Sequence, residues 1–84
     1  MDRKEIEEKV KEILAKELNI KKENITPEKR LIEDLGMDSF TSIELIFELE
    51  DRLGIDIPEK ETFKLITVGD IINYIVFRLS EKKK

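Results

Sequence analysis

Residues 35–40, Leu-Gly-Met-Asp-Ser-Phe, decide the fold, because they predict where a long connection ends and an acidic helix begins. Gly36 tolerates backbone angles that other residues avoid, so it can end the structure before it. Asp38 is a good N-cap, which places Ser39 in the first helical turn. Free backbone N–H groups and the positive end of the helix dipole there favour a phosphate on a serine oxygen. A serine at a helix start is more often only a cap, and the stretch alone leaves both interpretations open.

The length and composition predict one small domain without reactive groups of its own. A chain of 84 residues suits a single domain over residues 1–84, with 1–2 and 81–84 frayed. It has no His and no Cys, which removes the usual general base, the usual metal ligand and any thiol nucleophile. We therefore expect no catalytic residue and no metal site. Without a signal-peptide core or a long apolar run, the expected location is cytoplasmic, with no membrane insertion.

Negative charge is concentrated in the middle of the chain. Residues 31–63 carry two Lys/Arg and ten Asp/Glu, whereas both flanking regions are slightly basic. Such a surface repels nucleic acid and anionic lipid, and it attracts basic protein surfaces. An ordinary solvated acidic face explains the concentration equally well.

Apolar spacing predicts an all-α four-helix bundle. Helices are expected over residues 3–18, 39–53 and 58–65, the last of these short, and a fourth helix begins after Thr67. Local signals mark their ends: capping boxes of Asp2 with Glu5 and of Thr67 with Asp70, a stop at Asn19 and a C-cap at Gly54. A long loop, residues 19–38, joins the first two helices, and a short helical turn is expected at Thr26. Five apolar residues should anchor this loop: Ile20, Ile25, Leu31, Ile32 and Leu35.

The predicted second helix has two distinct faces on a helical wheel. The core face carries four apolar residues: Ile43, Ile46, Leu49 and Leu53. The opposite face carries three acidic residues: Glu44, Glu48 and Asp51. Phe40 and Phe47 flank the acidic face, as apolar anchors inside a charged rim do at docking surfaces. The Phe47 ring has an equally good alternative position, folded inward at the edge of the core.

These landmarks together resemble the acyl carrier protein family. Residues 31–40 match the core motif of that family, and residues 55–58 and 66–70 occur where it has its Ile-Pro link and Thr-Val helix start. The resemblance covers nearly the whole chain. It implies that Ser39 receives 4′-phosphopantetheine from coenzyme A and that Asp38 is the motif acid and helix cap. The protein would then carry acyl groups as thioesters in fatty-acid or related lipid biosynthesis, without being an enzyme.

The resemblance also implies partners, namely a phosphopantetheinyl transferase and acyl-processing enzymes with basic docking faces, which bind a monomeric carrier. Six residues are expected to meet them: Phe40, Glu44, Phe47, Glu48, Glu50 and Asp51. For Glu50 this assignment rests on the resemblance alone. Phe40 replaces the usual Leu, and Thr41 replaces a frequent acid. A specialised carrier for a polyketide or aminoacyl group therefore stays open, as does a helical interaction module without a prosthetic group, in which Ser39 is only a cap.

The acyl chain is expected to be stored partly inside the bundle. Five residues should line the space for it: Ser42, Ile46, Phe63, Leu65 and Ile66. Ser42 would sit at the mouth, close to Ser39. The short third helix has few apolar anchors and should be among the easier elements to displace.

Overall fold

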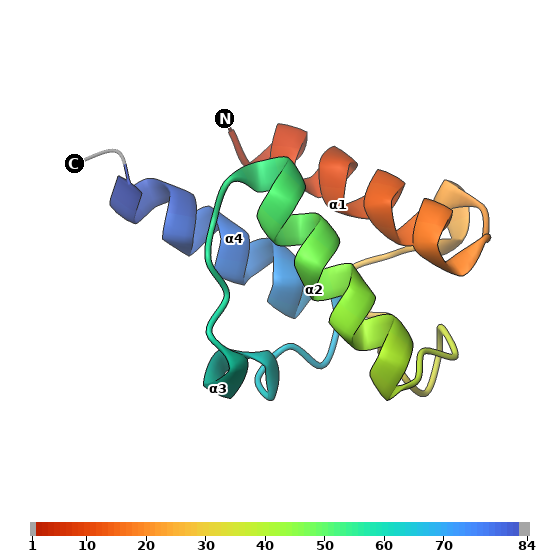
Figure 1. Cartoon of the computed structure of the whole chain (residues 1–84). Coiled ribbons are helices and arrows are strands. Elements are labelled where there is room, and N and C mark those ends of the chain that lie inside the picture. The colour runs from red at the N-terminus through yellow and green to blue at the C-terminus, as the bar shows by residue number, and fades with distance from the viewer. Residues whose placement is uncertain (1, 83–84) are drawn as a thin grey trace.

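The computed structural model describes residues 2–82, and the side chains of residues 2–80. Its elements are α1 (Arg3–Leu18), the 3₁₀-helix η1 (Lys22–Asn24), α2 (Ser39–Leu53), α3 (Glu59–Thr62) and α4 (Val68–Lys82) (Figure 1). The predicted all-α class, with a short third helix and a long first loop, is confirmed. Residues 1–2 and 81–84 were expected to fray. Asp2 instead caps α1 and α4 continues to Lys82, while residues 1 and 83–84 lie outside the described range.

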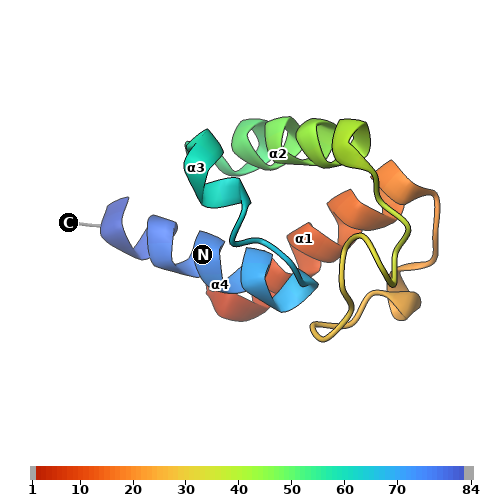
Figure 2. The same cartoon turned by 90° about the horizontal axis from the view of Figure 1, so that it is seen from below.

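Helix α1 is the scaffold on which α2 and α4 pack. Asp2 and Glu5 form the predicted capping box, and Asn19 ends the helix in a left-handed conformation, also as predicted. The stripe of Ile6, Val10 and Leu14 is completely buried. Figure 1 shows α1 across the top of the view with most of α2 and α4 below it, and Figure 2 shows α1 and α4 crossing each other beneath α2.

The predicted core face of α2 is wrong at its centre. Leu45 is buried with Leu49 and Leu53, whereas Ile43 is 54% exposed and Ile46 is half-buried. The wheel gave the angles between these residues correctly, but it could not tell which side of α2 packs into the bundle, and the buried side is the one that carries Leu45. The short α3 leaves Ile43 and Ile46 beside an open groove.

The connection over residues 19–38 is attached to α4 by backbone hydrogen bonds. Leu31 N–H donates to the carbonyl of Ile66, and Val68 N–H donates to that of Lys29. The short helical turn predicted at Thr26 is present as a single hydrogen-bonded turn, in which Lys29 N–H donates to the Thr26 carbonyl, and it does not extend into a helix. The next carbonyl, that of Pro27, instead accepts from Gly69 N–H at 2.8 Å.

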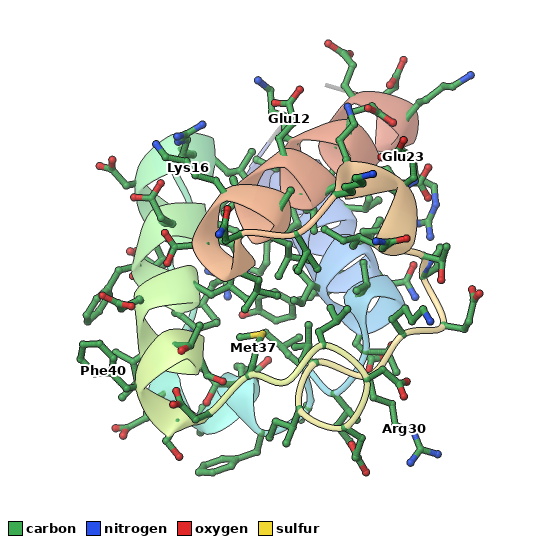
Figure 3. The ribbon with its side chains drawn as sticks, turned by 90° about the vertical axis from the view of Figure 1, so that its right-hand side faces the viewer. Glu12, Lys16, Glu23, Arg30, Met37 and Phe40 are labelled. Atoms are coloured by element: carbon green, nitrogen blue, oxygen red, sulfur yellow. The ribbon has the colours of Figure 1, made fainter. Side chains whose placement is uncertain are left out.

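The anchors of the connection are only partly as predicted. Ile25 and Leu31 are buried, and Ile20 and Leu35 pack against the core, but Ile32 is exposed. The sequence interpretation missed Met37, which is 3% exposed and points into the bundle interior (Figure 3). Burial of Met37 therefore fixes the position of the chain immediately before α2.

The link from α2 to α3 is extended, as the proline at its end predicts, and it buries Ile55 and Ile57. Helix α3 ends at Thr62 instead of continuing to residue 65 as predicted, and it buries none of its own residues. The final helix has the predicted cap, since Asp70 N–H donates to Thr67 Oγ1 and Thr67 N–H donates to Asp70 Oδ2. Over residues 2–82, no helix combines the length and the apolar character needed to cross a bilayer.

Candidate functional site

A tight turn brings the chain from the loop into α2. Gly36 has φ +72°, in the region that favours glycine, and its N–H donates to the carbonyl of Ile32. Met37 N–H then donates to the carbonyl of Leu31, while the Met37 side chain is buried. With the chain fixed from inside at Met37, the next two residues, Asp38 and Ser39, lie exposed at the surface.

Asp38 caps α2 as predicted. Its carboxylate accepts from Thr41 N–H at 2.8 Å, and its carbonyl accepts from both the N–H and the hydroxyl of Ser42. The bond from the Thr41 backbone N–H holds the pKa of the Asp38 carboxyl below its ordinary value, with a further contribution from the Thr41 side chain. The carboxylate form of Asp38 thus fixes the first turn of α2, in which Ser39 is the first residue.

The cap should weaken only in acid. Because folding lowers the Asp38 pKa, its stabilising contribution is complete above the unfolded-state pKa and disappears as the pH falls through the folded-state pKa. In a pH titration, the Thr41 amide proton shift should move with a midpoint below 3.8, the ordinary Asp value. Asp38→Asn keeps an acceptor oxygen but should abolish this titration. A midpoint at or above 3.8, or the same titration in Asp38→Asn, would contradict the assignment.

A groove of about 680 Å³ runs beside Ser39, between α2 and the segment from Ile57 to Ile66. Its wall includes all five residues that were predicted to line an acyl pocket, namely Ser42, Ile46, Phe63, Leu65 and Ile66. Most of the lining is apolar, and Ser39 and Ser42 lie together at one end of it. The Ser42 hydroxyl already donates to the Asp38 carbonyl, so the Ser39 hydroxyl is the one presented to a reagent there.

The groove also contains residues that sequence reasoning missed. Leu31, Ile32, Met37 and Ile43 contribute to its lining. Leu31, Ile32 and Met37 come from the connection before α2. Backbone hydrogen bonds, among them the one from Leu31 N–H to the Ile66 carbonyl, bring that connection against the region after α3. The apolar residues on either side of residues 35–40 could have indicated the groove, but their spacing led us to interpret them as core residues or as anchors of the loop.

The outer face of α2 combines exposed aromatic rings with carboxylates. Phe40 is 70% exposed and Phe47 is 64% exposed, so the Phe47 ring is not folded into the core, although it also borders the groove. Figure 3 shows the Phe40 ring directed away from the bundle. Glu44 and Asp51 are exposed, while Glu48 is half-buried and pairs with Arg52 at 3.3 Å. Glu44 and Asp51 are therefore the carboxylates of this face that no described cation neutralises.

Glu50 differs from the other predicted docking residues. It is half-buried, lines the groove, and accepts the backbone N–H of Ile57 at 2.8 Å. The other acidic side chains give no metal site, because residues 2–82 contain no group of three or more His, Cys, Asp or Glu that could hold a cation.

Comparisons with known proteins agree on one family. Residues 8–75 match the model of the phosphopantetheine attachment site. An acyl carrier protein of Thermosynechococcus vestitus is 45% identical over 75 residues, covering 89% of this chain and 93% of the relative. The solved structure of the acyl carrier protein from Enterococcus faecalis has a TM-score of 0.79 and 33% identity, covering 93% of this chain and 99% of that one. The predicted resemblance is thereby confirmed.

Proposed function

The chain belongs to the acyl carrier protein family, and on this premise we propose that Ser39 is the residue that accepts 4′-phosphopantetheine. The family assignment means that the protein holds acyl groups as thioesters on this arm and is a carrier, not a catalyst. The arm supplies the thiol that the chain, without cysteine, cannot provide. The observation that carries the Ser39 assignment is its exposed place at the start of α2 and at the end of the groove.

The residues around Ser39 fit a phosphate ester. Thr41 N–H and Ser42 N–H are used by Asp38, and the Phe40 N–H also helps to stabilise the Asp38 carboxylate. The Ser39 N–H, for which no hydrogen bond is found among the described residues, and the helix dipole favour an anion. The neighbouring Asp38 carboxylate opposes it, but exposure to water weakens that repulsion. Asp38 acts as the motif acid by holding the helix start that presents Ser39.

We propose that the outer face of α2 docks the transferase and the acyl-processing enzymes. The exposed Phe40 and Phe47 rings supply apolar contact, and Glu44 and Asp51 attract basic residues on a partner. Glu48 contributes less, because Arg52 already pairs with it. The concentrated negative charge also disfavours self-association and binding to nucleic acid, which supports a monomeric carrier.

The proposed pathway is fatty-acid or related lipid biosynthesis. One observation favours a specialised carrier as the second candidate, since the strongly exposed Phe40 lies next to Ser39, where partners meet the attachment site. Mass spectrometry of the protein purified from its native source will identify the bound acyl group. Saturated and 3-oxo or 3-hydroxy alkyl chains would support lipid synthesis, whereas an aminoacyl or branched polyketide group would support the second candidate. Protein that carries no arm at all would contradict both.

An alkyl chain stored in the groove should raise the melting temperature. Burial contributes about 0.8 kcal/mol per CH₂, so roughly six methylenes give about 5 kcal/mol before repacking. Since the groove exists already but its wall must shift, we expect a net gain of about 1–3 kcal/mol, or at least about 4 °C in Tm. Calorimetry should show octanoyl protein melting above the free-thiol form, and acetyl protein melting with the latter. Equal Tm values for the octanoyl and acetyl forms would mean that the chain stays in solvent.

A further inference from the structure

The wall of the groove opposite α2 is weakly attached to the rest of the molecule. It is formed by residues 58–65, which include the four-residue α3. Every hydrogen bond found for this segment joins two of its own residues. The first is donated by Glu61 N–H to the Pro58 carbonyl, and the last by Leu65 N–H to the Thr62 carbonyl. Apolar packing attaches it mainly at Leu65, which is half-buried against the core. The position of the segment therefore depends on the residues at its two ends.

The two ends are held by side chains of α2 and α4. At the far end, Asp70 accepts from Ile66 N–H at 3.0 Å, while Leu31 N–H donates to the Ile66 carbonyl. At the near end, Ile57 N–H donates to Glu50 Oε2 at 2.8 Å. No other hydrogen bond is found for the Ile57 N–H among residues 2–82, and the Ile57 side chain is buried. Glu50 thus joins the start of the groove wall directly to α2.

We propose that Glu50 is a positioning residue that holds residues 58–65 at a fixed distance from α2 and thereby sets the width of the groove. Its carboxylate bonds to the chain's own backbone, in contrast to the exposed Glu44 and Asp51. A charge-assisted hydrogen bond to an otherwise unpaired N–H is strong enough to control a segment with so few other contacts. When this bond opens, Ile57 and the segment after it can move away from Ile46 and widen the space for a chain.

Amide hydrogen exchange on the unmodified full-length protein tests the bond without any arm. In Glu50→Ala, exchange at Ile57, Glu61 and Leu65 should become about tenfold faster or more, while Val10 in the core stays unchanged. Glu50→Gln keeps an acceptor oxygen and should stay within about threefold of wild type by the same reasoning. Asp56→Ala, which removes an exposed charge one residue from Ile57, should leave Glu61 and Leu65 unchanged. If Glu50→Ala unfolds the protein, Glu50→Leu replaces it with the same expectation.

Three exchange results would overturn the proposal. They are unchanged exchange in Glu50→Ala, an equal increase in Asp56→Ala, and an equal increase in Glu50→Gln. The effect on the groove rests on the proposed carrier function and is measured separately, as the rate at which hydroxylamine cleaves the octanoyl thioester. Cleavage should be several-fold faster in Glu50→Ala than in wild type or Glu50→Gln, because a wall that is no longer held to α2 lets hydroxylamine enter the widened groove. Equal rates would overturn the positioning role. If no arm can be attached, the carrier assignment of Ser39 fails, and exchange alone decides the role of Glu50.

Discussion

Ser39→Ala should abolish the gain in mass that the wild-type protein shows after incubation with coenzyme A and a broad-specificity phosphopantetheinyl transferase. Wild type should gain the mass of one phosphopantetheine, measured on the intact protein. The effect is all-or-none, because the phosphoester forms on one hydroxyl oxygen. Ser39 is exposed at the first position of α2, whereas the nearby Ser42 hydroxyl donates to the Asp38 carbonyl.

Two serine variants control for general effects of the substitution. Ser80→Ala removes an exposed hydroxyl on α4 and should leave the gain in mass intact. Ser42→Ala removes the other serine hydroxyl of α2 and should also be modified, because the Ser42 Oγ supports the helix start but is not the acceptor. No gain in wild type, or a gain that survives Ser39→Ala, would contradict the attachment site. A protein that binds basic partners without ever being modified would instead be an interaction module.

Reversing Glu44 and Asp51 to Lys should slow association with the transferase by at least about tenfold at low salt, because steering by complementary charge acts mainly on the association rate. Both side chains are exposed, so the free energy of unfolding should change little. Association of the wild-type protein should also slow as salt is added, since a Debye length of about 8–10 Å near 0.1–0.15 M screens exposed charges. Stopped-flow binding at several salt concentrations measures both effects.

The matched control reverses the same number of charges elsewhere. Glu12 on α1 and Glu23 in η1 are exposed, and Figure 3 shows both at the α1 end of the molecule, away from Phe40. Glu12→Lys with Glu23→Lys changes the net charge equally and should alter association by about twofold or less, because only distant, screened charges differ. If the two double variants behave alike, net charge alone governs association. The carboxylates beside Phe40 and Phe47 would then be an ordinary solvated face.

Much of the fold could be predicted because caps and stops are local. Asp2 with Glu5 marked the start of α1. Asp38 and Gly54 marked the two ends of α2 at the same residues at which the structure places its caps. Such signals act between residues three or four apart, so they can be read directly from the chain. Ser39 was found in the same way, from its position next to an N-cap.

Other features depended on which segments meet in space. Helix α2 carries apolar residues around more than half of its circumference, so spacing could not say that Leu45 is buried in the core while Ile43 is exposed beside the groove. The Pro27 carbonyl turned out to serve Gly69, which lies far along the chain, and no local signal announces such a bond.

The sequence by itself determined the helices, the position of the proposed attachment serine and the acidic character of α2, because local hydrogen bonding and side-chain type specify them. The tertiary structure alone decided which α2 side chains face solvent and which form contacts within the molecule. Glu50 and Asp51 are neighbours of the same charge, yet one bonds to the Ile57 backbone and the other faces solvent. Position around a helix gives the direction of a side chain, but its role depends on what a distant part of the chain places opposite it.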